Sequence, residues 1–323
     1  MMGLFDSLRE ASGPSVAVEF AADHVSAASL DMRGGTPAVS VHATEPLPPG
    51  ALVPSLTAVN VHNRQVVSSA LERVLERTGN PRRVGVVIPD LVAKVSLVRF
   101  EHVPARTSDL DQLVRWQVRK TAPFPIEEAQ VSYVPGIKAA DGQEFVVSLA
   151  RRSVVEEYEG LCAAAGAHAG IVDLATFNVI NAALAAAPPA SSDSDWLLVH
   201  VAADYASIAI LRGRHLIFFR NRGTEGEGTL ADVVHQTSMY YEDRLQGAGF
   251  ARAFLTGAAG ANARQNADAE ELRRSLQDRL QRPIETVDAS RAAALTDRIS
   301  ASPALLDTLA PLVGLLVRGR EAA

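Results

Sequence analysis

WLLVHVAADYASIAILRGRHLIFFRN, residues 196 to 221, is the stretch that decides the fold. Its apolar runs, with Arg212-Gly213-Arg214 between the last two, predict three strands joined by tight turns. Residues 17 to 30, AVEFAADHVSAASL, align on it without a gap at residues 198 to 211, LVHVAADYASIAIL, with a constant offset of 181 (204 minus 23). The match places Ala21-Ala22-Asp23 on Ala202-Ala203-Asp204 and Ser26 on Ser207. A hairpin that occurs twice predicts a chain of two lobes built on the same strand pair.

The composition is that of a folded globular chain. A length of 323 residues suggests about two domains. The net charge of −6 argues against a general nucleic-acid binder, because phosphate binding needs a basic face. The single cysteine, Cys162, excludes an internal disulfide and favours a reducing compartment. Since the sequence has neither a long apolar run nor a secretory leader, we expect a cytoplasmic protein.

The order of predicted elements gives a domain plan. Residues 1–90 and 167–187 are predicted to form the core of a first lobe, and 91–166 a small α+β subdomain inserted in it. The segment PPASSDSD makes 188–195 the predicted linker. Residues 196–323 are then the second lobe, with 246–290 as its outer subdomain.

Two capping boxes and a short terminal helix are also predicted. Ser108 with Asp111, and Thr229 with Asp232, have the spacing of helix N-termini. Apolar residues in 2–8 can share one helix face, for which packing on the chain's own domain is favoured over contact with a bilayer or a partner.

Four further segments carry a family resemblance. They are IPDLVAKVSLVRF (88–100), LVRWQVRKTAPFPIEEAQVSY (113–133), IVDLATFNVINA (171–182) and MYYEDRLQGAGFARAFLTGAAG (239–260). With the two hairpins, they resemble the PilM family of type IV pilus assembly, which is related to GspL-type secretion proteins and to FtsA. The resemblance implies an α/β, actin-like (ribonuclease H-like) fold of two lobes, with a subdomain inserted in the first.

The resemblance also implies a nucleotide site at the two hairpin turns, and the sequence departs from the pattern there. The positions are Glu19, Ala21, Ala22 and Asp23 in the first turn, His200, Ala202, Ala203 and Asp204 in the second, and Gly257 and Gly260 in a later loop. Related ATPases have Asp-x-Gly at each turn. A carboxylate roughly 4 Å from a phosphate oxygen repels it by about 4 kcal/mol at an effective dielectric of 20. A backbone hydrogen bond to a charged group returns about 1.5–3 kcal/mol. ATP binding is therefore disfavoured unless Mg²⁺ held by acids of both turns reverses the balance.

The function that the resemblance implies is a scaffold at the inner membrane. A PilM-like protein binds the N-terminal cytoplasmic peptide of a bitopic PilN-like protein, and a pilus motor or platform protein is a further partner to consider. The expected partner-binding residues are Val95, Leu97, Leu113, Trp116 and Phe124. No catalytic residue, metal site or nucleic-acid partner is predicted. The alternatives are a nucleotide-switching ATPase of the same machine and a GspL-like component of type II secretion.

Overall fold

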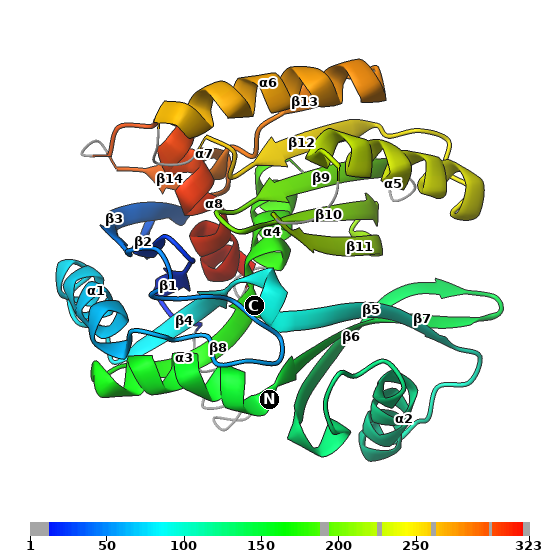
Figure 1. The fold of residues 1–323 in the computed structure, drawn as a ribbon, viewed down its shortest axis with the longest axis horizontal. Coiled ribbons are helices and arrows are strands. Elements are labelled where there is room, and N and C mark those ends of the chain that lie inside the picture. Colours follow the sequence, from blue (N-terminus) through cyan, green and yellow to red (C-terminus); the bar gives the residue numbers. More distant parts are fainter. Residues whose placement is uncertain (1–12, 188–193, 225–227, 260–262, 297–298, 319–323) are drawn as a thin grey trace.

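The computed structural model describes residues 13–187, 194–224, 228–259, 263–296 and 299–318. Within these residues the strands form sheets of six, five and three strands, and helices pack between and around them (Figure 1). The predicted helix within 2–8, and residues 188–193 of the predicted linker, lie outside the described residues. In this part of the chain, no helix has both the length and the apolar character needed to cross a bilayer.

The first sheet has the order β14-β3-β2-β1-β4-β8. Its strands are β1 (Val16–Phe20), β2 (His24–Arg33), β3 (Thr36–Pro46), β4 (Arg83–Ile88), β8 (His168–Leu174) and β14 (Ala294–Leu295). β1, β2 and β3 form the predicted antiparallel meander, and β4 and β8 add to it in parallel. All five residues of β1 are buried, because the sheet is covered on both faces.

Helices cover the two faces of this sheet. They are α1 (Arg64–Arg77) and α3 (Arg152–Ala164) on one face, and α4 (Ala175–Ala186) and α8 (Pro303–Arg318) on the other. Successive strand residues point to opposite sides, so Val18 packs with the first pair and Ala17 with the second. α4 and α8 approach closely at Gly314, where an added Cβ would lie 1.7 Å from the carbonyl oxygen of Asn178.

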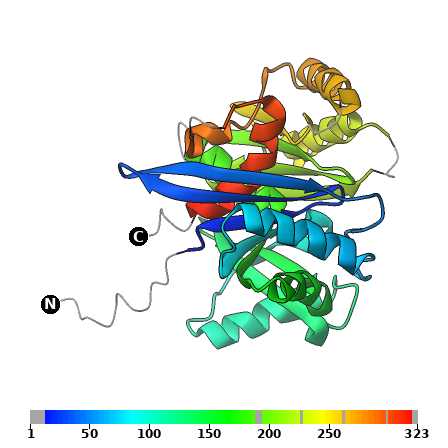
Figure 2. The ribbon, with the colours of Figure 1, turned by 90° about the vertical axis from the view of Figure 1, so that its left-hand side faces the viewer.

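The second sheet has the order β11-β10-β9-β12-β13. Its elements are β9 (Asp195–Val201), β10 (Tyr205–Arg212), β11 (His215–Gly223), β12 (Arg252–Thr256) and β13 (Ile284–Glu285), with helices α5 (Leu230–Arg244), α6 (Ala263–Leu280) and α7 (Ala289–Ala292). One face packs on α5 and α6, and the other packs on α4 and α8. The two large sheets therefore share the α4–α8 layer, which lies between them (Figure 2).

The three-stranded sheet lies beside the first lobe. It has the order β5-β7-β6, with β5 (Ala93–Phe100), β6 (Ala129–Ala139) and β7 (Gly142–Arg151). One face of the sheet carries α2 (Thr107–Arg119). Two short 3-10 helices, Asp90–Val92 and Ile126–Glu128, precede β5 and β6. Phe145, Val147 and Leu149 of β7 pack with the buried side of α2. The intervening residues of β7 point to the opposite face of the sheet, away from α2.

Three details differ from the sequence-based expectations or refine them. The Thr229–Asp232 capping box of α5 is confirmed, but the Ser108–Asp111 box is wrong, since α2 begins at Thr107 with no side-chain cap. Asp195, assigned to the linker, begins β9. β14 pairs with β3 and so belongs to the first sheet, although all of 196–323 was expected to form the second lobe. The domain boundaries otherwise stay a prediction.

Candidate functional site

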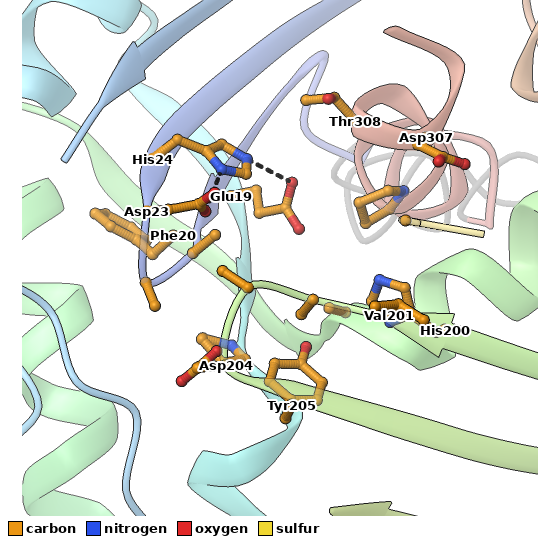
Figure 3. A pocket seen from close by; sticks show the side chains of 18 of the residues that line it. Glu19, Phe20, Asp23, His24, His200, Val201, Asp204, Tyr205, Asp307 and Thr308 are labelled. Atoms are coloured by element: carbon orange, nitrogen blue, oxygen red, sulfur yellow. Dashed lines mark hydrogen bonds and ion pairs between the residues drawn. The ribbon is translucent and has the colours of Figure 1, made fainter. Parts of the chain in front are cut away.

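The two hairpin turns face each other across a cleft of about 640 Å³ (Figure 3). The turn after β1 is closed by the Ala21 N–H, which donates to the His24 carbonyl oxygen at 2.9 Å. The turn after β9 is closed in the same way, from Ala202 to Tyr205, at 2.8 Å. The strand register is also equivalent, because Glu19 pairs with Ser26 and His200 with Ser207. The structure thus confirms the duplication and brings the described candidate residues of both turns together.

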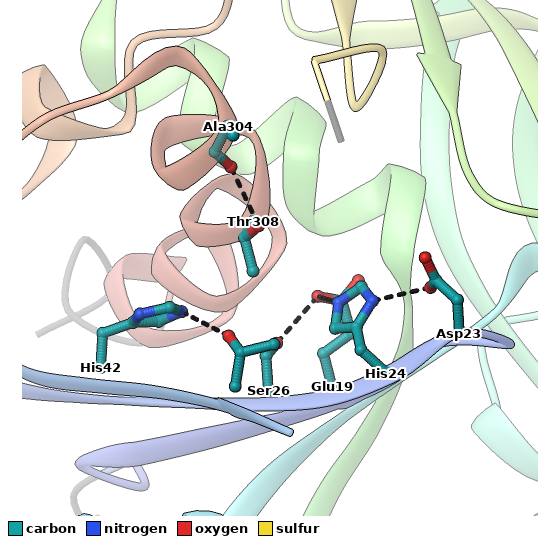
Figure 4. Close-up of polar contacts among 8 residues, drawn as sticks. Glu19, Asp23, His24, Ser26, His42, Ala304 and Thr308 are labelled. Carbon is teal, nitrogen blue, oxygen red and sulfur yellow. Dashed lines mark hydrogen bonds and ion pairs between the residues drawn. The ribbon is translucent and has the colours of Figure 1, made fainter. Parts of the chain in front are cut away.

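The first turn holds a compact polar network (Figure 4). The Ser26 hydroxyl donates to Glu19 at 3.2 Å, His24 Nδ1 lies 2.7 Å from an Asp23 oxygen, and His24 Nε2 lies 3.9 Å from Glu19. Burial opposes the charge of His24, but the hydrogen bond with Asp23 and the negative charges of Asp23 and Glu19 outweigh it and raise the His24 pKa to about 10. Burial also opposes the Asp23 carboxylate, and His24 outweighs it, so that the Asp23 pKa is lowered. The turn therefore carries an imidazolium between two carboxylates.

His200, in the second turn, does not reproduce this network. It is buried, and its Nδ1 lies 2.8 Å from the Thr176 hydroxyl at the start of α4. That hydroxyl donates its single proton to the Asp90 carboxylate, so His200 Nδ1 donates to the Thr176 oxygen. The His200 ring is thereby tied to the α4 N-terminus through its Nδ1–H.

Asp90 is the residue that sequence reasoning missed. Its side chain is fully buried, and it accepts from the Thr176 backbone N–H at 3.1 Å and from the Ser207 hydroxyl at 2.6 Å. Its carbonyl oxygen accepts from the Asn221 side chain at 3.0 Å. Asp90 follows β4 of the first lobe, whereas Ser207 and Asn221 lie on β10 and β11 of the second. A single buried carboxylate therefore connects the two lobes beneath the cleft.

Asp204 has an environment unlike that of Asp23. Among the described residues, no cationic side chain pairs with its carboxylate. Burial raises the Asp204 pKa to about 6, with hydrogen bonding to backbone opposing the shift and the charge of Asp23 adding to it. The acid at the same turn position thus has a lowered pKa in one lobe and a raised pKa in the other.

The later loop completes the cleft. Gly257 has φ of +77°, and an added Cβ would lie 2.0 Å from the Val201 carbonyl oxygen, so close packing on the second turn requires glycine there. Asp307 of α8 accepts from the Thr256 hydroxyl and from the Ala259 backbone N–H, both at 2.9 Å. The Ala259 amide is therefore bound by a carboxylate of the chain itself. Gly260 lies outside the described residues.

The lining of the cleft is mainly apolar with acidic groups. Glu19, Asp23, Asp204 and Asp307 line it, together with the two histidines, and the described lining contains no Lys or Arg. Within the described part of the chain, no group of three or more His, Cys, Asp or Glu is arranged to hold a metal ion.

A second concavity, which we call the groove, has a volume of about 930 Å³ and lies between the first lobe and the insertion, with Leu211 and residues 214–216 of the second lobe also lining it. Residues 130 and 132–136 of β6 form one side, and 169–174 of β8 form another. β6 and β8 are both edge strands, so each presents backbone groups that no strand of the described residues pairs on that side. The groove floor includes Val146, Ile171 and Phe177. An extended apolar chain fits such a surface.

The five residues expected to bind a partner lie outside the lining of the groove. Val95 packs against both first-lobe cores, and Leu97 is half-buried on β5. Leu113 and Phe124 pack against the core under α2. Trp116 is 59% exposed on the outer side of α2. The groove uses alternate residues of β7, Val146, Ser148 and Ala150, and so lies on the face of the sheet opposite to α2.

Comparison with known proteins gives both a family and a fold. Residues 17–248 match the family model described as type IV pilus assembly protein PilM. The solved structure described as a PilM-PilN type IV pilus biogenesis complex superposes with a TM-score of 0.78 at 18% identity, covering 95% of this chain and 98% of that one.

Two other solved structures are more distant. A protein from Bacteroides thetaiotaomicron with an actin-like ATPase fold and unknown function has a TM-score of 0.49 at 11% identity, covering 88% and 94% of the two chains. The cytoplasmic domain of EpsL, from the type II secretion system of Vibrio cholerae, has a TM-score of 0.45 at 11% identity, covering 74% and 80%. The expectation of an α/β, actin-like fold is confirmed.

Proposed function

The chain belongs to the PilM family of type IV pilus assembly proteins, and from this premise we propose that it is a cytoplasmic scaffold that binds the N-terminal peptide of a PilN-like membrane protein in the groove. The observation that carries the proposal is the meeting of two edge strands, β6 and β8, over an apolar floor. An extended peptide entering there gains backbone hydrogen bonds from a strand edge, and its alternate side chains meet Ile171 and Phe177. The partner's membrane segment then holds the scaffold at the inner membrane.

We further propose that the cleft has lost productive nucleotide binding. Four carboxylates line it, and the one imidazolium, His24, is already shared between Asp23 and Glu19. His200, which lines the cleft, is bound by Thr176, and the N–H of Ala259 in the adjoining loop is bound by Asp307. These residues fit a triphosphate poorly. Calorimetric titration with Mg-ATP tests this, because micromolar binding would contradict it and favour a nucleotide-switching protein.

A peptide titration tests the groove. A fluorescent peptide with the sequence of the cytoplasmic N-terminus of a PilN-like partner should bind the wild type. Val134→Glu should weaken binding at least tenfold, because Val134 lies on β6 at the groove and is 58% exposed, so that the change places a charge on the peptide with little effect on folding. Met32→Glu, at a 52% exposed position of β2, is the matched control and should bind as the wild type.

The same titration decides between the groove and the residues expected from the sequence. Trp116→Ala and Phe124→Ala should leave peptide affinity unchanged if the groove is the site, because neither residue lines it. Loss of peptide affinity in these variants, with Val134→Glu binding as the wild type does, would place the peptide-binding site at α2 and contradict the proposal.

A further inference from the structure

Trp116 is the most exposed aromatic side chain of the described residues, and it lies in a distinctive position on α2. The helical repeat places Gln112, Trp116, Arg119 and Lys120 on one side, which we call the α2 face. Val114 and Val118 lie on the opposite side and are buried against β7. A large indole exposed on a well-packed helix has no role in the core of the insertion, so the α2 face needs another explanation.

The α2 face is cationic. Lys120 Nζ lies 5.2 Å from the centre of the Trp116 ring, and neither Arg119 nor Lys120 has a carboxylate partner among the described residues. Lys94 adds a further cation at the same end of the helix, where its Nζ donates to the Thr121 carbonyl oxygen at 2.8 Å. Residues 112–120 contain no Asp or Glu. These positive charges contrast with the net charge of −6 of the whole chain.

Four acids lie near the α2 face, and two of them, Asp109 and Glu127, are exposed. The other two are engaged within the insertion. Asp111 accepts from the Tyr133 hydroxyl at 2.6 Å, and Glu128 is paired with Arg151 at 2.8 Å. Both contacts hold the carboxylates against the insertion itself. The exposed residues Pro123 and Pro125 continue the surface just beyond Lys120, with Phe124 half-buried between them. The result is an aromatic and apolar surface bordered by cations.

We propose that the α2 face binds the surface of an anionic phospholipid bilayer. An indole beside Lys and Arg matches the headgroup region, where tryptophan rings lie at the interface and cations meet lipid phosphates. A peptide partner fits less well, because peptides bind in grooves or along strand edges, and neither the cleft nor the groove includes a residue of α2. The groove lies on the other face of the three-stranded sheet, so a peptide bound there leaves Trp116 exposed.

This contact adds to the proposed function and does not depend on it. A tether to a membrane protein raises the effective concentration of the α2 face at the bilayer, so a weak lipid contact is enough to orient the scaffold. Each cation near an anionic surface contributes roughly fivefold in partitioning, and the contact should weaken as salt is raised.

The test is co-sedimentation of the full chain with vesicles of phosphatidylglycerol and phosphatidylcholine in about a 1:3 ratio. The wild type should bind these vesicles and not vesicles of phosphatidylcholine alone. Arg119→Gln with Lys120→Gln should reduce partitioning roughly tenfold or more, and Trp116→Ala should reduce it further. The matched control is Met239→Ala with Arg244→Gln on α5, which removes one exposed apolar side chain and one exposed cation from another helix and should bind as the wild type.

Tryptophan emission gives a second measurement. Trp196 is buried, so a blue shift on adding anionic vesicles would report Trp116 and should vanish in Trp116→Phe. The proposal is overturned if the α2 variants sediment as the wild type does, if no anionic vesicle is bound, or if binding needs no anionic lipid. It is also overturned if the α2 variants lose the PilN-like peptide and keep the vesicles. Peptide affinity unchanged in every α2 variant keeps the two proposals separate.

Discussion

The two copies of the hairpin have the same backbone and different electrostatics. Each turn is closed by the same hydrogen bond, and each presents an aspartate to the cleft, Asp23 or Asp204. The residue that follows is histidine in the first copy and tyrosine in the second. His24 lowers the pKa of Asp23, whereas burial without a paired cation in the described part of the chain raises the pKa of Asp204 to about 6. A repeated fold therefore does not imply a repeated charge.

The buried position on the preceding strand differs as well. Glu19 is satisfied inside its own hairpin by Ser26, the residue opposite to it. His200 and Ser207 occupy the equivalent pair, but they bond to Thr176 and to Asp90 of the other lobe. The first copy is thus self-contained and the second depends on the first lobe. This asymmetry makes the lobe junction the most sensitive polar site in the molecule.

The largest effect should come from Asp90→Asn. The amide presents a donor to groups that are themselves donors, the Thr176 and Ser207 hydroxyls, in a fully buried site. Unfolding free energy, measured with urea, should fall by about 3–5 kcal/mol. Asp31→Asn, at an exposed acid of β2, should change it by less than about 0.5 kcal/mol. A loss under about 1 kcal/mol for Asp90→Asn would show that the two lobes are not held through this carboxylate.

Asp90 also marks the limit of what the sequence predicts. The duplicated hairpin was evident because its signal is local, as was the Thr229–Asp232 cap. The partners of Asp90 lie 86 and 117 residues away, and no spacing rule connects them. The only local signal was a Pro-Asp pair at the end of a buried strand. Likewise, no spacing in the sequence indicates that α8 packs between the two sheets, and β14 is too short to have an alternation pattern.

Exchanging Glu19 and His200, the equivalent residues of β1 and β9, tests whether the two copies of the hairpin are interchangeable. His200→Glu should lower the unfolding free energy by about 2–4 kcal/mol, because it places a second carboxylate beside Thr176 and Asp90 in a buried site. Glu19→His should cost about 1–2 kcal/mol, since it removes the acceptor of Ser26 and adds a base beside His24.

A double-mutant cycle measures the coupling between Asp90 and His200. Asp90→Asn should be less harmful in the His200→Glu background than in the wild type, because it removes the like charge. Strict additivity of the two losses would mean that residues 90 and 200 are not coupled through Thr176.

The pH dependence of stability should report His24. Its pKa in the folded protein is raised from 6.5 to about 10, so its stabilisation is fully present below pH 6.5 and is lost as pH rises through 10. The difference in unfolding free energy between wild type and His24→Gln should therefore shrink across this window, by about 2 kcal/mol for a partly exposed group. His42, near His24 and with its pKa lowered to about 4, stays neutral over the window, so His42→Gln is the control that should show no such slope. A constant difference from pH 6.5 to 10 would contradict the imidazolium assignment.

The smallest effect gives the sharpest comparison, because Asp23→Asn and Asp204→Asn should change the unfolding free energy in opposite directions. The folded pKa of Asp204 lies above its ordinary value of 3.8, so the stabilising protonated form is lost as pH rises through about 6, and the ionised form is a cost at pH 8. Asp204→Asn should then stabilise the protein at pH 8 by about 1 kcal/mol or less and be neutral at pH 4. Asp23→Asn should destabilise it at pH 8 by about 0.5 kcal/mol, because it removes the partner of His24. Urea unfolding at the two pH values measures both variants, and equal signs would mean that the two turns share one electrostatic role after all.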